Sequence, residues 1–364
     1  MRSYLQAIEA NIFGKLVKPK ILVIESDDWG SIRTFSKKSY DKLGESYPEI
    51  LKSDYLRYDC LENDTDLNEL FKILRKHKDS HGLSAKITAN TVMTNPDFSR
   101  IKDSNFENYY YQSFTETLEE RDGHDRVRQF YMQGIDENLF YPQFHGREHV
   151  NIELWLSLLK SDKMFRDAFD LSVWGISRDL RPDIPTSIQA TYDTGLDIAK
   201  ESIASGLNLF EEIFGYRSKT FIANNFIWAS DLEKTLSVHG VEYLQGMKYQ
   251  FLPLQEGGKR ERIRHWFGQT NEFGQTYGIR NCSLELTERL STVESCVKEV
   301  AMAFAFRKPA IVSMHRLNFM GGLDPANRTK GLEALDLFLA NITKRFPDIR
   351  FMTTPELHAY LTKA

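Results

Sequence analysis

The sequence contains acidic and histidine side chains whose types and spacing could bind a divalent metal ion and move protons. Asp27 and Asp28 are adjacent acids that follow the run "ILVIES", His145 and His149 lie four residues apart in "HGREH", and His315 ends the run "AIVSMH". Two adjacent carboxylates repel each other, and burying them without a counter-charge is costly. A cation held between one of them and the two histidines would remove much of that cost.

Two histidines and one carboxylate form a ligand set that suits divalent transition metals and leaves coordination positions open. We therefore predict that Asp28, His145 and His149 bind a divalent metal ion, whose identity this ligand set does not decide. Such an ion lowers the pKa of a bound water and polarises a carbonyl. Asp27 would then accept a proton as general base, and His315 would protonate the leaving group.

Each of these residues also has a simpler explanation when it is taken alone. Asp27 or Asp28 could cap a helix or a turn, because both positions favour short acidic side chains. His145 and His149 could be exposed neighbours on one helical face, and His315 could be a buried structural histidine. The metal site is favoured because all three groups follow predicted strands.

Short β-like runs alternate with amphipathic helical patterns along the chain, which is typical of a mainly parallel α/β fold. The predicted strands are "KILVIES", "LSAKITAN", "LFYPQFH", "FDLSVWG", "KTFIANN", "VEYLQG", "PAIVSMH" and "RFMTT". The predicted helices lie near 65–77, 150–160, 194–213, 229–238, 287–305 and 330–345, with a short last helix from Pro355. Active sites of such folds form at the C-terminal ends of the strands, so a parallel barrel would bring the acids and histidines to one rim.

Two segments fit this alternation poorly and are predicted to be insertions on the rim. Residues 97–137 are charged and rich in tyrosine, and residues 251–280 carry glycine, arginine and Trp266 without clear periodicity. No repeat, low-complexity tract or linker divides the chain, so we predict a single domain over residues 1–364.

The bulk composition narrows the class of protein. The net charge of −4 gives no sign of a nucleic-acid partner, and no apolar stretch is long enough to span a membrane. The three cysteines are odd in number and show no paired spacing, which disfavours a disulfide framework or a thiolate zinc site. The first twenty residues lack the pattern of a secretory signal, so a cytoplasmic location is expected. The oligomeric state is not predicted.

The order and spacing of these motifs resemble the polysaccharide deacetylase family of carbohydrate esterases, which includes chitin and peptidoglycan deacetylases. The family's motif Thr-Phe-Asp-Asp-Gly is similar to Glu25–Gly30 with one extra residue before the glycine, and its His-Ser/Thr-x-x-His motif is similar to His145–His149. A late strand ending in Leu-x-His is similar to Ser313–His315, and a closing Phe-x-Thr-x-x-Glu-Leu to Phe351–Leu357. The resemblance runs from about residue 20 to the C-terminus, apart from the two insertions.

This resemblance implies a distorted (β/α) barrel of the glycoside hydrolase/deacetylase type and a metal-dependent hydrolase that removes N- or O-acetyl groups from an acetylated carbohydrate. It implies that Asp27 is the catalytic base, that Asp28, His145 and His149 are the metal ligands, and that His315 is the acid. Zinc is the ion expected from this resemblance, with Co²⁺, Ni²⁺ and Fe²⁺ as alternatives.

The family's Arg-Pro-Pro-Tyr-Gly motif is absent after "KTFIANNFIW", so the sequence predicts no arginine partner for Asp27, and it predicts no carboxylate partner for His315. Asn224, Asn225 and Trp228 are the candidate substrate-binding residues in that region, although Trp228 could equally belong to the core. Two alternatives therefore stay open: a carbohydrate-binding protein with weak or no turnover, and a hydrolase of a non-sugar amide.

Overall fold

Strand β1 (Ile21–Trp29) lies in the middle of a parallel sheet and is buried along its full length. A strand covered on both faces reads as a continuous apolar run, which is why "ILVI" predicts it. The structure is a computed structural model that describes residues 4–121, 126–255, 258–287 and 290–363. Within it, β1 pairs in parallel with β2 (Ile87–Thr91), β12 (Ala310–His315) and β13 (Arg350–Phe351).

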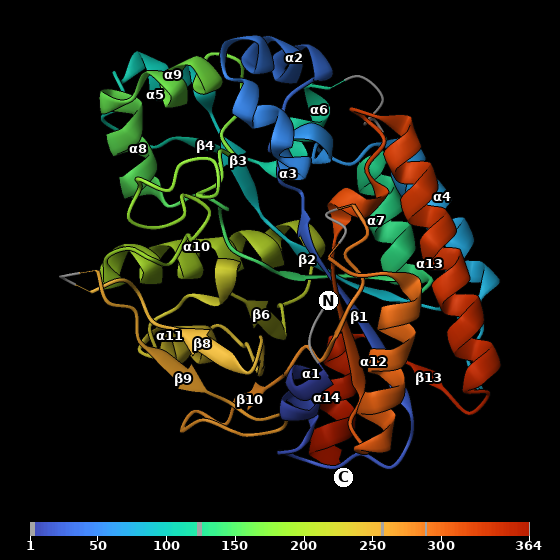
Figure 1. The fold of residues 1–364 in the computed structure, drawn as a ribbon. Coiled ribbons are helices and arrows are strands. Elements are labelled where there is room, and N and C mark those ends of the chain that lie inside the picture. Colours follow the sequence, from blue (N-terminus) through green and yellow to red (C-terminus); the bar gives the residue numbers. More distant parts are fainter. Residues whose placement is uncertain (1–3, 122–125, 256–257, 288–289, 364) are drawn as a thin grey trace.

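The strand order of the sheet is β10-β7-β6-β5-β2-β1-β12-β11, with β13 beside β1 (Figure 1). The other five strands are β5 (Phe140–Phe144), β6 (Thr220–Ile222), β7 (Tyr243–Gln245), β10 (Thr276–Tyr277) and β11 (Cys282–Ser283). All pairings in this sheet are parallel, and the ladders recorded for the described residues do not join β10 to β11. The sheet is an open, distorted barrel, and the predicted fold class is confirmed.

Helices alternate with these strands and cover the outside of the barrel. They are α4 (Asp64–Lys76), α7 (Val127–Asp136), α10 (Leu196–Phe214), α11 (Leu232–Val238), α12 (Val293–Ala305), α13 (Pro325–Arg345) and α14 (Thr354–Lys363), with α1 (Tyr4–Asn11) at the N-terminal end. Their starts follow local capping rules: Asn63 and Asp66 form a capping box at α4, and Asp324 caps α13 ahead of a first-turn proline. Figure 1 shows α4, α7 and α13 side by side along one flank.

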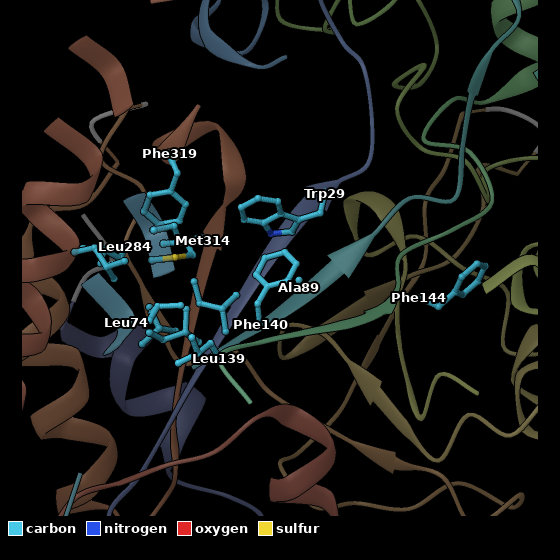
Figure 2. Close-up of a cluster of buried hydrophobic side chains, with 14 of the residues drawn as sticks. Trp29, Leu74, Ala89, Leu139, Phe140, Phe144, Leu284, Met314 and Phe319 are labelled. Carbon is cyan, nitrogen blue, oxygen red and sulfur yellow. The ribbon is translucent and has the colours of Figure 1, made fainter. Parts of the chain in front are cut away.

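The core under the sheet is built largely from aromatic side chains and aliphatic residues of the strands and helices (Figure 2). Trp29, at the end of β1, is fully buried and meets the ring of Phe140 edge to face at 4.7 Å. Its indole nitrogen donates to Ser26 Oγ at 3.0 Å. Trp29 therefore anchors the C-terminal end of β1, immediately after the two acids, to the core.

A second hydrophobic cluster lies apart from the barrel core, beyond the C-terminal end of β1 (upper left of Figure 1). Its elements are α2 (Lys37–Ser46), η1 (Pro48–Lys52), α3 (Asp54–Tyr58), α5 (Phe98–Asp103), α8 (Ile152–Ser161) and α9 (Lys163–Phe169). The antiparallel pair β3 (Thr94–Pro96) and β4 (Tyr111–Ser113) leads into it, and α6 (Phe114–Glu119) follows. This second hydrophobic cluster lies beyond the strand ends that carry the predicted site.

The structure corrects two expectations about secondary structure. The run "FDLSVWG" is not a strand of the sheet, because Val173 and Trp174 pack into the second cluster and Ser172 has a positive φ of 54°. The segments 97–137 and 251–280 are not confined to the rim: the first supplies α7, which packs on α4 and β5, and the second supplies strand β10.

The single-domain prediction stays a prediction. Among the described residues, no helix has both the length and the apolar character needed to cross a bilayer.

Gly331 lets helix α13 approach the 3₁₀ segment η3 (Arg316–Phe319) that follows β12. A Cβ at this position would lie 1.6 Å from the backbone oxygen of Asn318, which cannot move aside as a side chain could. Helix propensity alone favours alanine over glycine by about 1 kcal/mol. The overlap should outweigh this gain, and we expect Gly331→Ala to lower the free energy of unfolding by about 1–3 kcal/mol, measured by urea denaturation.

The exposed Ala340 of the same helix provides the comparison. Ala340→Gly should cost about 1 kcal/mol through propensity alone. A stabilised Gly331→Ala protein would show that the close approach of α13 to η3 is wrong.

Candidate metal centre

The two adjacent acids share one cavity because β1 is irregular where it ends. β1 is in regular register with β2 up to Ser26, and the register shifts between Ser26 and Trp29. Asp28 has a φ of 74°, a conformation that few residues other than glycine adopt. In a regular strand, neighbouring side chains point to opposite faces. Here the bulge turns the chain so that Asp27 and Asp28 both line the same cavity.

Asp28, His145 and His149 converge on one point. Asp28 Oδ1 lies 3.2 Å from His145 Nε2 and 3.0 Å from His149 Nε2. One ligand atom from each residue lies within 4.8 Å of the others, and all three residues are buried. The histidines are not on a helix, because residues 145–150 form an irregular turn, yet their rings are 5.2 Å apart between centroids. The predicted ligand set is thus brought together by the fold.

The hydrogen bonding of His145 fits a cation in this position. Its Nδ1 lies 3.0 Å from the backbone oxygen of Ile222, which can only accept, so Nδ1 carries the proton. In the neutral ring, Nε2 is then an unprotonated acceptor that faces the carboxylate oxygen of Asp28. A metal ion between these two acceptors, or a proton on Nε2, makes the contact favourable. A backbone carbonyl that fixes the tautomer in this way is the usual outer partner of a metal-binding histidine.

The charged state of Asp28 is strongly favoured. Burial alone would raise the pKa of this carboxyl, but His149, His145 and the Arg33 guanidinium hold it well below the usual range. Burial lowers the pKa of His149, and Asp28 opposes that shift. An ionised carboxylate and neutral imidazoles are the forms that bind metal ions.

Asp27 has an arginine partner that the sequence does not reveal. Arg280, just after β10, donates from Nη1 to Asp27 Oδ2 at 2.5 Å and from Nη2 to Asp27 Oδ1 at 2.7 Å. Asn90 also donates to Oδ1 at 2.7 Å. Burial raises the pKa of Asp27, but Arg280, His145 and His315 together outweigh this and the net shift is downward. The expectation that Asp27 lacks an arginine is therefore wrong.

His315 has the carboxylate partner that is also not predicted. Its Nδ1 lies 2.7 Å from Glu285 Oε1, just after β11, and its Nε2 lies 4.0 Å from Asp27 Oδ2. Burial would lower the pKa of His315, but Glu285 and the two aspartates raise it to about 10. The side chain is 27% exposed, so Nε2 of a protonated imidazole is available to the cavity.

These groups belong to a larger buried network of charges. Its acidic members are Glu25, Asp27, Asp28, Asp59, Glu62 and Glu285, and its basic members are Arg33, Arg280, Arg316 and His315. Burial raises the pKa of Glu25, while Arg280 and a hydrogen bond from Thr354 oppose the shift. Six acidic side chains thus face four basic ones in this network, and a divalent cation at Asp28 would add positive charge to it.

The cavity in front of these residues has a volume of about 840 Å³, within the range of small-molecule sites. Asn224 and Asn225 line it, as predicted, and Asn224 Nδ2 lies 3.3 Å from His145 Nε2. Trp228 does not line it: the ring is 3% exposed, and its nitrogen donates to Glu233 Oε1 at 3.1 Å. Trp228 is therefore a core residue and not a substrate-binding residue, because its indole nitrogen has its hydrogen-bond partner within the barrel wall.

Comparison with known proteins finds likeness only among solved structures. No family model and no curated protein sequence matches the chain. Similar structures include a 4-alpha-glucanotransferase from Thermococcus litoralis, which is 11% identical and has a TM-score of 0.48. The match covers 96% of the present chain but 41% of the glucanotransferase chain.

Two further similar structures are carbohydrate esterases or deacetylases. One is a family 4 acetyl xylan esterase from Clostridium thermocellum, 12% identical with a TM-score of 0.39, matched over 94% of this chain and 91% of its own. The other is a mutant peptidoglycan deacetylase from Bacillus subtilis, 8% identical with a TM-score of 0.40, matched over 95% and 93%. At such low sequence identities the similar structures do not establish a function, and the inference of function depends on the geometry of the site.

Metal binding can be tested without a substrate. We expect the wild-type chain, reloaded with zinc and dialysed, to retain near-stoichiometric metal by elemental analysis, and His149→Ala to lose most of it. His77→Ala is the matched control, because His77 is also buried but pairs with Asp336. A wild-type chain that retains neither zinc, cobalt nor nickel would contradict the metal centre.

The pairing of His315 with Glu285 predicts an unusual titration. In zinc-free protein, the NMR resonance of His315 should titrate near pH 10, and Glu285→Gln should move the midpoint down. Because the folded pKa exceeds the usual value of about 6.5, the pairing stabilises the fold below that pH and its contribution is lost as the pH rises through about 10. Asp336→Asn, at the His77 pair, should leave the His315 midpoint unchanged.

Proposed function

We propose that the chain is a metal-dependent hydrolase that removes N- or O-acetyl groups from a carbohydrate, with zinc as the expected ion. The observation that carries this proposal is a base and an acid of opposite protonation state on one cavity wall. Asp27 Oδ2 and His315 Nε2 are 4.0 Å apart, next to the convergent ligand atoms of Asp28, His145 and His149. Pairs of titratable groups whose surroundings push their pKa values apart mark acid and base roles.

The residues around Asp27 define which of its atoms would accept a proton. Oδ1 already accepts from Asn90 and Arg280, whereas Oδ2 accepts from Arg280 and also faces His315. Oδ2 is therefore the proposed proton acceptor. Arg280 keeps the carboxylate ionised and fixes its plane, since a bidentate pair restricts rotation.

His315 would supply the proton to the departing amine or alcohol. Glu285 holds Nδ1, so the ring presents Nε2 to the cavity, and the raised pKa keeps it protonated at neutral pH. Asn318 donates to Glu285 Oε2 at 3.0 Å and keeps that carboxylate in place. A bound divalent ion would add Lewis acidity, which lowers the pKa of water and polarises the acyl carbonyl.

The choice of an acetylated carbohydrate comes from the sequence motifs that resemble the polysaccharide deacetylase family. The alternative of a binding protein with lost turnover drew its support from a missing arginine, and Arg280 removes that support. Hydrolysis of a non-sugar amide would use the same groups. Assays with both acetylated carbohydrates and acetanilides distinguish this alternative from the proposal.

The role of Asp27 separates catalysis from metal binding. We expect Asp27→Asn to lower the rate of acetate release by about 10²–10⁴, because general base catalysis is lost, while zinc content stays near that of wild type. The assay uses zinc-loaded protein with N-acetylglucosamine oligomers, acetylated xylan and simple acetanilides.

Loss of zinc in Asp27→Asn would instead make Asp27 a ligand. Release of acetate from the acetanilides alone would favour the non-sugar amide alternative. A zinc-loaded wild type without turnover on all of these substrates would contradict the proposed hydrolase.

A further inference from the structure

Arg33 touches the predicted metal ligand Asp28 from inside the protein. We propose that Arg33 is a positioning residue that holds the Asp28 carboxylate so that Oδ1 alone faces the metal. The inference rests on the metal centre within the proposed function, and it concerns metal affinity and not turnover. Arg33 lines the same cavity as the ligands and is 1% exposed.

The contacts of Arg33 fix its guanidinium in place. Nη2 donates to Asp28 Oδ2 at 2.9 Å, and Nε donates to Asp59 Oδ2 at 2.8 Å. The group also lies over the ring of Tyr55 at 4.6 Å and of Trp174 at 5.4 Å. Within the described residues, Nη1 has no hydrogen-bond partner, so the two carboxylates account for the hydrogen bonds of this side chain. Arg33 is thus held between two acids and two aromatic rings.

Asp59 connects Arg33 to the opposite side of the site. Its second oxygen accepts from Arg316 Nε at 3.0 Å, and Arg316 directly follows His315 at the end of β12. Arg316 also donates to Glu62 and to the backbone oxygen of Ser31, so it joins β12 to the loop after β1. A buried chain of ion pairs therefore fixes the position of the Arg33 guanidinium.

Asp28 needs such an external support because of its backbone. Its φ of 74° costs energy for a residue with a Cβ, and such strain persists only where the surroundings enforce it. Arg33 engages Oδ2 and leaves Oδ1 facing both imidazoles. Partners that orient a ligand in this way commonly change metal affinity by about 10–100-fold when they are removed.

Simple electrostatics predicts the opposite effect. A positive guanidinium repels a nearby cation and also lowers the pKa of Asp28, so its removal should tighten metal binding if charge were the only factor. Positioning predicts weaker binding after the same removal. The sign of the change therefore decides between the two roles.

The test is a competition titration of the full-length chain with zinc and a chelating dye. We expect Arg33→Lys to weaken zinc binding by about 10–100-fold, because it keeps the charge but replaces the guanidinium fork by a single nitrogen. We expect Arg33→Met, which removes the charge, to weaken it by a similar factor. Asp59→Asn, which leaves Arg33 and Asp28 intact but loosens the anchor, should weaken it in the same direction. Arg328→Lys, at an ion pair with Asp66 away from the cavity, should leave zinc affinity unchanged.

Circular dichroism identifies variants that fail to fold, and if Arg33→Met is among them, Arg33→Lys and Asp59→Asn decide the question. Unchanged or tighter zinc binding in folded Arg33→Lys and Asp59→Asn would overturn the proposal. So would a wild-type chain that binds no zinc. Failure of hydrolysis with the expected affinity changes would overturn the proposed function alone.

Discussion

The burial of several carboxylates in β1, in residues 59–62 and after β11 is the constraint on which the rest of this structure depends. An uncompensated buried charge is costly, and removing one partner of a buried ion pair typically costs about 3–5 kcal/mol. Three arginines that are at most 1% exposed meet these acids, and they come from the loop after β1, from the segment after β10 and from the residue after β12. The acids therefore require that distant parts of the chain meet at one rim.

The sequence predicts most of this framework because the relevant signals are local. Short β-like runs predict the buried parallel strands β1, β2, β5 and β12, and amphipathic patterns predict α4, α8, α10, α12 and α13. The spacing of His145 and His149 also suffices to predict that the rings lie close together, although an irregular turn and not a helix brings them there. The prediction of a strand at "FDLSVWG" is wrong because the apolar residues of this run pack in the second hydrophobic cluster.

The partners of the catalytic candidates could not be predicted because they depend on tertiary contacts. Arg280 lies 253 residues from Asp27, and Glu285 lies 30 residues from His315. Both follow strands of only two residues, β10 and β11, which are too short to show a periodic pattern. A single sequence offers no signal that singles out these two charged residues among the others. Their contacts depend on the tertiary fold, which brings the segments after β10 and β11 to the ends of β1 and β12.

The two adjacent aspartates differ in their surroundings because their arginine partners differ. Asp27 receives both ends of one guanidinium, so its plane is fixed and Oδ2 stays near His315. Asp28 receives one nitrogen of Arg33, so only Oδ2 is occupied and Oδ1 is free to face the imidazoles. The bulge at the end of β1 places both carboxylates on the same cavity, but it does not distinguish them. The arginines do so, which is consistent with the proposed roles of Asp28 as a metal ligand and Asp27 as a base.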